Sequence, residues 1–94
     1  MKINLLIDDK EKTFSIPFVP ARKLREALAL RKETNFSDID PEGLDKMVAY
    51  VVDLYKNQFT IDDVYDGIAS SELIPTITDT IGEVINGKQS QKNE

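Results

Sequence analysis

DPEGLDKMVAYVVDLYKN, residues 40–57, is the most apolar helical segment that the sequence predicts. Asp40 followed by Pro41 is a strong helix start, because aspartate caps a helix N-terminus and proline suits the first helical position. Apolar residues then recur at the spacing of one helix face. They are Leu44, Met47, Val48, Val51, Leu54 and Tyr55, with Tyr50 and Val52 widening the stripe. We therefore expect this helix at the centre of the core, with Met47 and the tyrosines as packing residues rather than a cofactor site.

Two runs near the N-terminus alternate apolar and polar residues, which predicts a β-hairpin. Residues 2–8 and 12–18 supply the strands, and DDKE at 8–11 lies between them. Pro17 cannot donate a ladder hydrogen bond, so the second strand is an edge there or ends. A lone hairpin is barely stable in water, so its apolar face must lie on helices or on another subunit. The inward residues of this pattern are Ile3, Leu5, Ile7, Phe14, Ile16 and Phe18.

Residues 21–34, ARKLREALALRKET, predict a first helix with Leu24, Ala27 and Leu28 on its apolar face. Its cations are Arg22, Lys23, Arg25, Arg31 and Lys32. They form no interleaved pattern with aromatic residues, and Glu26 and Glu33 interrupt them, so the pattern favours a solvated basic face over a nucleic-acid site. A patch that meets acids on a neighbouring subunit is an intermediate interpretation.

TIDDVYDGIASSE, residues 60–72, admits a calcium loop or a short capped helix. A calcium loop with Gly67 at position 6 has Asp62 and Asp66 at positions 1 and 5, but it lacks acidic residues at positions 3 and 12. A helix accounts for more residues, with Thr60 as N-cap, Asp63 completing a capping box and Gly67 as the stop. The apolar face of this helix is Ile61, Val64 and Ile68. The pattern therefore favours the helix, with the aspartates as cap and surface residues.

Residues 70–87, SSELIPTITDTIGEVING, predict the last helix, with Ser70 or Ser71 as the candidate cap and Gly87 as the end. Pro75 lies inside the pattern, so either the helix starts late or its first turn is irregular. Its apolar face is Ile74, Ile77, Ile81, Val84 and Ile85. The fold class is α+β and mainly helical, an N-terminal β-hairpin followed by about four helices. We expect one domain over residues 1–87 and a disordered polar tail at 88–94.

Composition excludes most catalytic schemes, because the chain has neither cysteine nor histidine. No catalytic, cofactor-binding or metal residues are predicted, and an enzyme is the least favoured class. The absence of cysteine is compatible with a reducing cytoplasm, and no apolar run is long enough to span a membrane. The net charge is −5 and unevenly spread. Residues 1–34 hold eight cations and five acids, giving +3, whereas residues 38–72 hold two cations and nine acids, giving −7. An acidic chain is a poor match for nucleic acid, and such a split can steer it towards a protein partner or another copy, although two ordinary solvated faces account for the split equally well.

The order of segments resembles the tail assembly chaperones of long-tailed, siphovirus-type phages and prophages of Gram-positive bacteria. The resemblance covers about residues 2–87, and its most distinctive part is VVDLYKNQFTIDDVYDGI followed by the ELIPTI helix. The RKLREAL run of the first helix supports it. Membership would imply a non-enzymatic assembly factor of the host cytoplasm that is absent from the mature virion.

The resemblance also implies partners. Such chaperones bind the tape measure protein, keep it soluble, and release it as tail tube subunits polymerise around it. The family often makes a second, longer product by ribosomal frameshifting, which recruits tube protein. This chain resembles the short form. Its expected partners are therefore the tape measure protein, tail tube protein through an extended product, and other copies of itself.

Two alternatives stay open on the sequence alone. One is a small adaptor or regulatory domain that binds a folded protein through its acidic surface, and the other is a calcium-binding module. For tape measure binding, the candidate contacts are exposed members of the apolar stripes, Leu30, Val52 and Tyr55, although each residue type is more often core.

Overall fold

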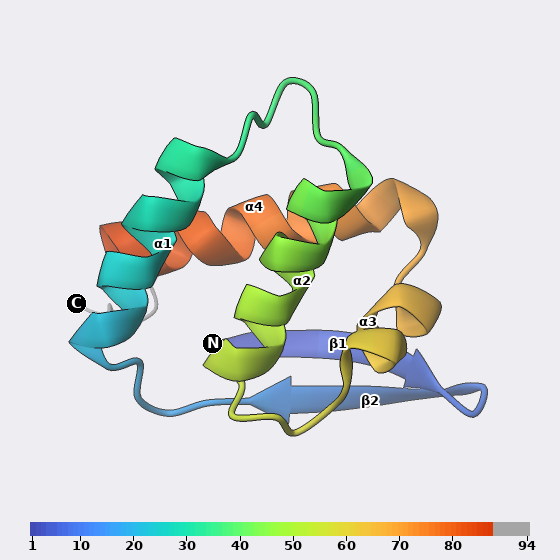
Figure 1. Cartoon of the computed structure of the whole chain (residues 1–94). Helices are drawn as coiled ribbons and strands as arrows, with labels where there is room; N and C mark the ends of the chain where they lie inside the picture. The colour runs from blue at the N-terminus through green and yellow to red at the C-terminus, as the bar shows by residue number, and fades with distance from the viewer. Residues whose placement is uncertain (88–94) are drawn as a thin grey trace.

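A computed structural model of the chain describes residues 1–87, and the predicted tail at 88–94 lies outside the described residues. The hairpin forms one layer with a short helix against it, and two adjacent helices stand over a long final helix that crosses them (Figure 1). The α+β, mainly helical fold is thus confirmed. The elements are β1 (Lys2–Ile7), β2 (Lys10–Ser15), α1 (Ala21–Glu33), α2 (Pro41–Leu54), α3 (Ile61–Gly67) and α4 (Ser70–Asn86).

The predicted hairpin is present, with a tighter turn than the sequence suggested. Only Asp8 and Asp9 lie between the strands, both at positive φ (54° and 65°), as a two-residue type I′ turn requires. Ile3 pairs with Phe14 on the inner face, which packs on helices as expected. β2 ends at Ser15, before the proline. The expected inward place of Phe18 is wrong, because this side chain lies beyond the strand and is 68% exposed.

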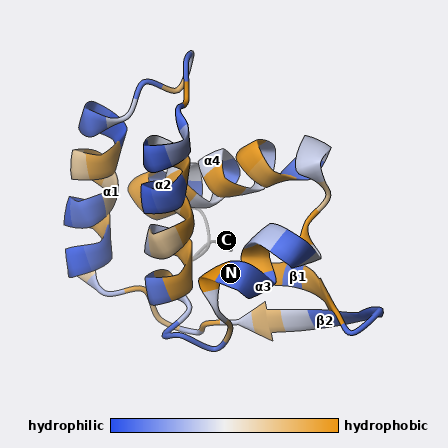
Figure 2. Cartoon of the chain, turned by 45° about the vertical axis from the view of Figure 1, so that its right-hand side comes forward, coloured by the Kyte–Doolittle hydropathy of each residue, from blue (hydrophilic) through white to orange (hydrophobic). Residues whose placement is uncertain are grey.

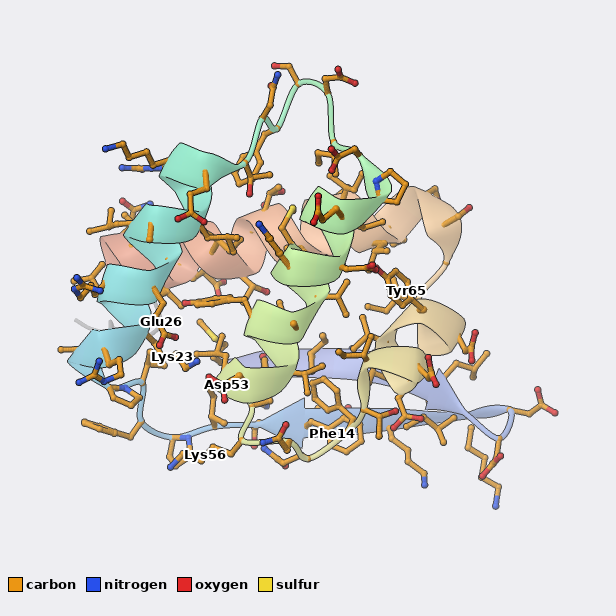
Figure 3. The ribbon with its side chains drawn as sticks, in the orientation of Figure 1. Phe14, Lys23, Glu26, Asp53, Lys56 and Tyr65 are labelled. Atoms are coloured by element: carbon orange, nitrogen blue, oxygen red, sulfur yellow. The ribbon has the colours of Figure 1, made fainter. Side chains whose placement is uncertain are left out.

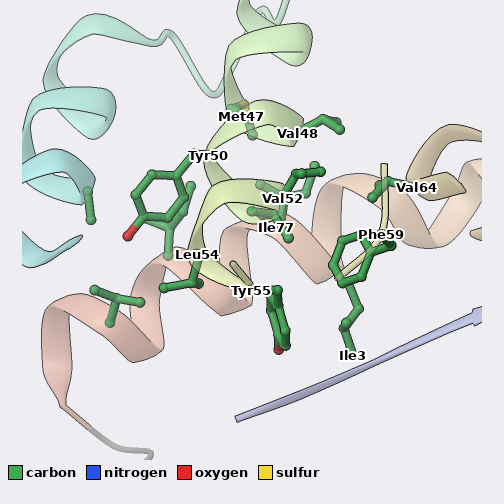
Figure 4. Packing of buried hydrophobic residues seen from close by; sticks show 14 of the residues in the cluster. Ile3, Met47, Val48, Tyr50, Val52, Leu54, Tyr55, Phe59, Val64 and Ile77 are labelled. Atoms are coloured by element: carbon green, nitrogen blue, oxygen red, sulfur yellow. The ribbon is translucent and has the colours of Figure 1, made fainter. Parts of the chain in front are cut away.

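Helix α2 forms the centre of the core, as predicted (Figure 4). The Asp40 carboxylate accepts a hydrogen bond from the Gly43 amide at 2.7 Å, which caps the helix. The helix ends at Leu54 rather than at residue 57, because Lys56 and Asn57 take left-handed backbone angles (φ 58° and 59°). This bend brings Phe59 back to the core. Its ring centroid lies 5.4 Å from that of Tyr55 and 5.0 Å from that of Phe14.

Helix α1 is rotated relative to the prediction. Its buried residues are Lys23, Ala27 and Leu30, whereas Leu24 and Leu28 are 37% and 41% exposed. Lys23 can occupy this buried position because Asp53 and Tyr50 of α2 partner its ammonium group. Figure 2 shows hydrophobic residues along α2, α4 and the hairpin, while α1 carries long hydrophilic stretches. The predicted apolar face is therefore confirmed for Ala27 and wrong for Leu24 and Leu28.

Helices α3 and α4 follow the prediction in extent but not in every cap. Gly67 ends α3, and Gly87 ends α4 in the left-handed conformation (φ 67°). Neither predicted serine caps α4, because the helix already begins at Ser70 and its N-cap is Ala69, which has no side-chain acceptor. Pro75 lies inside the helix, which begins at Ser70, so of the two alternatives for this proline the late start is wrong. Its missing N–H costs one hydrogen bond near the exposed start of the helix.

Candidate functional site

The aspartates of residues 60–72 belong to a helix cap. The Thr60 hydroxyl accepts from the Asp63 amide at 3.0 Å, and the Asp63 carboxylate accepts from the Thr60 amide at 2.9 Å. This is the predicted capping box. Asp62 and Asp66 are exposed. Within residues 1–87, no three acidic, histidine or cysteine side chains come together as metal ligands.

Gly67 has a packing role that the sequence did not indicate. A Cβ at this position would lie 2.9 Å from the Leu6 carbonyl oxygen, 3.2 Å from the Leu6 amide nitrogen and 3.3 Å from the Leu5 Cβ. The C-terminal end of α3 therefore presses directly against the backbone of β1. Glycine is required here for close approach, whereas the sequence indicated only a helix stop.

Lys23, near the start of α1, joins this helix to Asp53 near the end of α2 (Figure 3). Its ammonium group pairs with Glu26 at 2.8 Å and with Asp53, and lies 5.2 Å from the centroid of the Tyr50 ring. The Tyr50 hydroxyl donates to the Lys23 carbonyl oxygen at 2.8 Å. Burial, with a smaller effect of Glu26, raises the pKa of Tyr50 to about 12. We call Lys23, Glu26, Asp53 and Tyr50 the clamp. Glu26, Asp53 and Tyr50 each contact Lys23, so the cluster holds α1 against α2 and has a structural role.

A second tie holds α3 to α2. The Tyr65 hydroxyl donates to the Asp45 carboxylate. Burial, followed by this hydrogen bond, raises the pKa of Tyr65 to about 12. By contrast, the Tyr55 hydroxyl is buried without a hydrogen-bond partner in the part of the chain that the structure describes. Burial, and secondarily the charge of Glu83, raises the pKa of Tyr55 as well.

The surface offers one open, mainly apolar depression of about 570 Å³ between the end of α2 and the start of α3. Its lining residues are Val52, Asn57, Phe59, Thr60, Ile61 and Asp62. Val52 and Phe59 contribute little exposed area, whereas Ile61 is 41% exposed. The depression is open to solvent and does not enclose a small molecule.

The candidate tape measure contacts of the sequence analysis are buried: Leu30 and Val52 are each 7% exposed, and Tyr55 is fully buried. The prediction that these three residues are exposed contacts is therefore wrong, because they pack in the core of this chain. Large apolar side chains are exposed elsewhere. They are Leu6, Phe18, Leu24, Leu28, Phe36, Ile61 and Ile74.

The predicted basic face of α1 is present with one exception. Lys23 is buried in the clamp, whereas Arg22, Arg25, Arg31 and Lys32 are exposed and make no ion pair with any residue in the range 1–87. These four cations lie on a chain of net charge −5. They are available for an acidic partner.

Comparison with known proteins places the chain in a family. The model of a family described as phage tail chaperone protein matches residues 1–94. No curated protein and no solved structure matches the chain. None of the helices in the described residues is long and apolar enough to cross a membrane. Since the family match covers the full sequence, the chain belongs to the phage tail chaperone family.

Proposed function

We propose that this chain binds the tape measure protein of its phage during tail assembly, keeps it soluble, and is absent from the finished virion. The family match over residues 1–94 carries the proposal. A tape measure protein is long and helical, and in the free state it exposes apolar surface that promotes aggregation. A small binding domain that covers such surface in several copies lowers the concentration of the aggregating species.

The surface of the chain is compatible with this role. Exposed apolar side chains lie on α1, α3 and α4, and the α2–α3 depression offers a further apolar contact. Contiguous exposed apolar surface is typical of protein-binding sites, and Leu24 with Leu28, one helical turn apart on α1, are neighbours of this kind. We place the binding unit in residues 1–87 and its action in the host cytoplasm, as a non-enzymatic factor.

Recruitment of tail tube subunits is a further part of the proposal. We assign it to an extended frameshift product that shares this domain, while the short form covers the tape measure protein. Self-association between adjacent copies, favoured by the separation of basic and acidic regions, would align them along the client.

Co-expression with the tape measure gene of the same genome tests the proposal. The soluble fraction of the tape measure protein should rise severalfold with the chain and stay unchanged with an unrelated small acidic domain. A long helical protein from a different source serves as the second control, and its solubility should not respond. An unchanged soluble yield of the tape measure protein would reject the chaperone function and favour an adaptor for another folded protein.

A further inference from the structure

Among residues 1–87, four of the seven large hydrophobic residues that are exposed lie along α1 and at its two ends. Phe18 precedes the helix, Leu24 and Leu28 lie on it, and Phe36 follows it, with exposed fractions of 68%, 37%, 41% and 37%. Helix α1 lies at the edge of the molecule in both ribbon views (Figures 1 and 2). Its inner face already packs on α2 and α4. The outer leucines are therefore not part of the core that the chain builds for itself.

Charge surrounds these leucines. At about 3.6 residues per turn, Arg31 lies on one side of the Leu24–Leu28 row, and Arg25 and Lys32 lie on the other. Within residues 1–87 none of the three cations has an acidic partner. We call Leu24, Leu28, Arg25, Arg31 and Lys32 the α1 outer face. It is an apolar row with positive charge on both flanks.

We propose that the α1 outer face binds an amphipathic helix whose apolar stripe is flanked by acidic side chains. Leucines four residues apart form one of the surface rows that interdigitate when two helices pack. The flanking cations select glutamate or aspartate beside the partner's stripe, because unpaired like charges would repel a basic helix. This inference rests on the proposed function, since it assigns the contact with the helical client to this face.

Other occupants fit the observations less well. Nucleic acid would use the cations but leave the two leucines without a role, and the nearest exposed aromatic residues, Phe18 and Phe36, lie beyond the ends of the helix rather than between the cations. An anionic membrane would attract the cations, yet two partly exposed leucines on a packed helix insert little apolar area into a bilayer. A second copy of the chain would also supply acids. The effect of leucine substitutions on self-association and on peptide affinity distinguishes a second copy from a separate helical partner.

The probe is a synthetic helical peptide of about 20 residues, longer than the 13-residue α1, with leucines on one face and glutamates on both flanks. Its control has lysine in place of every glutamate. In ¹⁵N–¹H spectra the acidic peptide should shift the amides of residues 21–33, and calorimetry should show affinity about tenfold or more above that of the basic peptide. No binding, equal binding of the two peptides, or shifts confined to other elements would overturn the proposal.

Matched variants assign the contact. The double substitution Leu24→Ala and Leu28→Ala should lower peptide affinity about tenfold or more, whereas Ile74→Ala on α4, with the same 41% exposure as Leu28, should leave it unchanged. Circular dichroism establishes that each variant is folded. Equal affinity of both variants for the peptide would overturn the proposal.

Charge reversal provides a second comparison. Arg25→Glu with Arg31→Glu should weaken binding strongly, while Lys10→Glu with Lys46→Glu changes the net charge equally on other elements and should have a small effect. Equal effects would show that only net charge matters and would overturn the proposal. Tighter, leucine-dependent binding of duplex DNA or of phosphatidylserine vesicles would do the same. So would a leucine substitution that disperses a self-associated chain but leaves peptide affinity unchanged.

The two proposals can fail separately. If the wild-type chain raises the solubility of the tape measure protein and the Leu24→Ala, Leu28→Ala variant does so equally, the α1 inference fails and the chaperone function stands. If the wild-type chain has no effect on tape measure solubility, the chaperone function fails, and the peptide titration still decides what the α1 outer face binds.

Discussion

Substitution of Gly67 by alanine tests how tightly α3 is held against the hairpin. The added methyl group would lie 2.9 Å from a backbone oxygen and 3.2 Å from a backbone nitrogen of Leu6. Backbone atoms in a paired strand cannot rotate away, so α3 and β1 must separate by several tenths of an ångström. Overpacking of this kind costs about 1–3 kcal/mol.

A gain partly offsets this cost. Alanine lowers the conformational entropy of the unfolded chain relative to glycine and favours the helix, together about 0.5–1 kcal/mol. Gly67 is not among the residues with positive φ, so its backbone angles do not add strain in the alanine variant. We expect a net loss of about 1–2 kcal/mol in the free energy of unfolding. For a domain of this size the midpoint of thermal unfolding falls by roughly 5–10 °C.

The matched control is Gly82→Ala in the C-terminal part of α4. Apart from its chain neighbours and the backbone of its own helix, no atom of residues 1–87 lies within 4 Å of a Cβ built at Gly82, so the helix gain is not opposed by a clash. This variant should gain about 0.5–1 kcal/mol and unfold at a higher temperature. Urea and thermal unfolding followed by circular dichroism measure both variants. If Gly67→Ala is as stable as wild type while Gly82→Ala shows its gain, the close approach of α3 to β1 is refuted.

Four further outcomes are expected. Removing the unpartnered buried hydroxyl in Tyr55→Phe should leave the free energy of unfolding unchanged or raise it by up to about 1 kcal/mol, and a loss above that size in urea titrations would show an overlooked partner. Asp40→Ala should lose about 1 kcal/mol through the missing cap, in contrast to the exposed Asp38→Ala, and equal stabilities would contradict the cap. The pKa of Tyr50 is raised in the folded state from its ordinary value of 10.0 to about 12, so the stability that its neutral hydroxyl contributes is full below pH 10 and is lost as pH rises towards 12. Tyr50→Phe should lessen this alkaline loss of stability, and an unchanged dependence of the free energy of unfolding on pH would contradict the raised pKa. Sedimentation velocity should show self-association that weakens with added salt, and a monomer at high concentration in both low and high salt would count against it.

Local signals made much of the fold predictable. The signals that start two helices, Asp40 with Pro41 and Thr60 with Asp63, act within a few residues, as does the apolar spacing of α2. The local sequence is therefore sufficient to predict these helices. The hairpin followed from alternation for the same reason, although the Asp8–Asp9 turn was tighter than the DDKE segment suggested.

The rotation of α1 could not be read from its own residues. Leu24 and Leu28 fit an apolar face as well as Ala27 and Leu30 do, and a lysine is an improbable core residue by type. Its burial depends on Asp53 and Tyr50, which come about thirty residues later in the chain. The candidate binding surface was missed in consequence, because the prediction placed the two leucines on the same apolar face as Ala27. The packing role of Gly67 likewise depends on β1, far away in sequence.

Several copies of the chain must bind one tape measure protein if the family member acts as proposed, because a 94-residue domain covers only a short part of a long helical client. Native mass spectrometry of the co-expressed, purified complex counts these copies. We expect several chains per tape measure protein, with the number falling in proportion as the tape measure protein is shortened by internal deletion. A single bound chain whatever the length, or no complex at all, would contradict the proposed role in tail assembly.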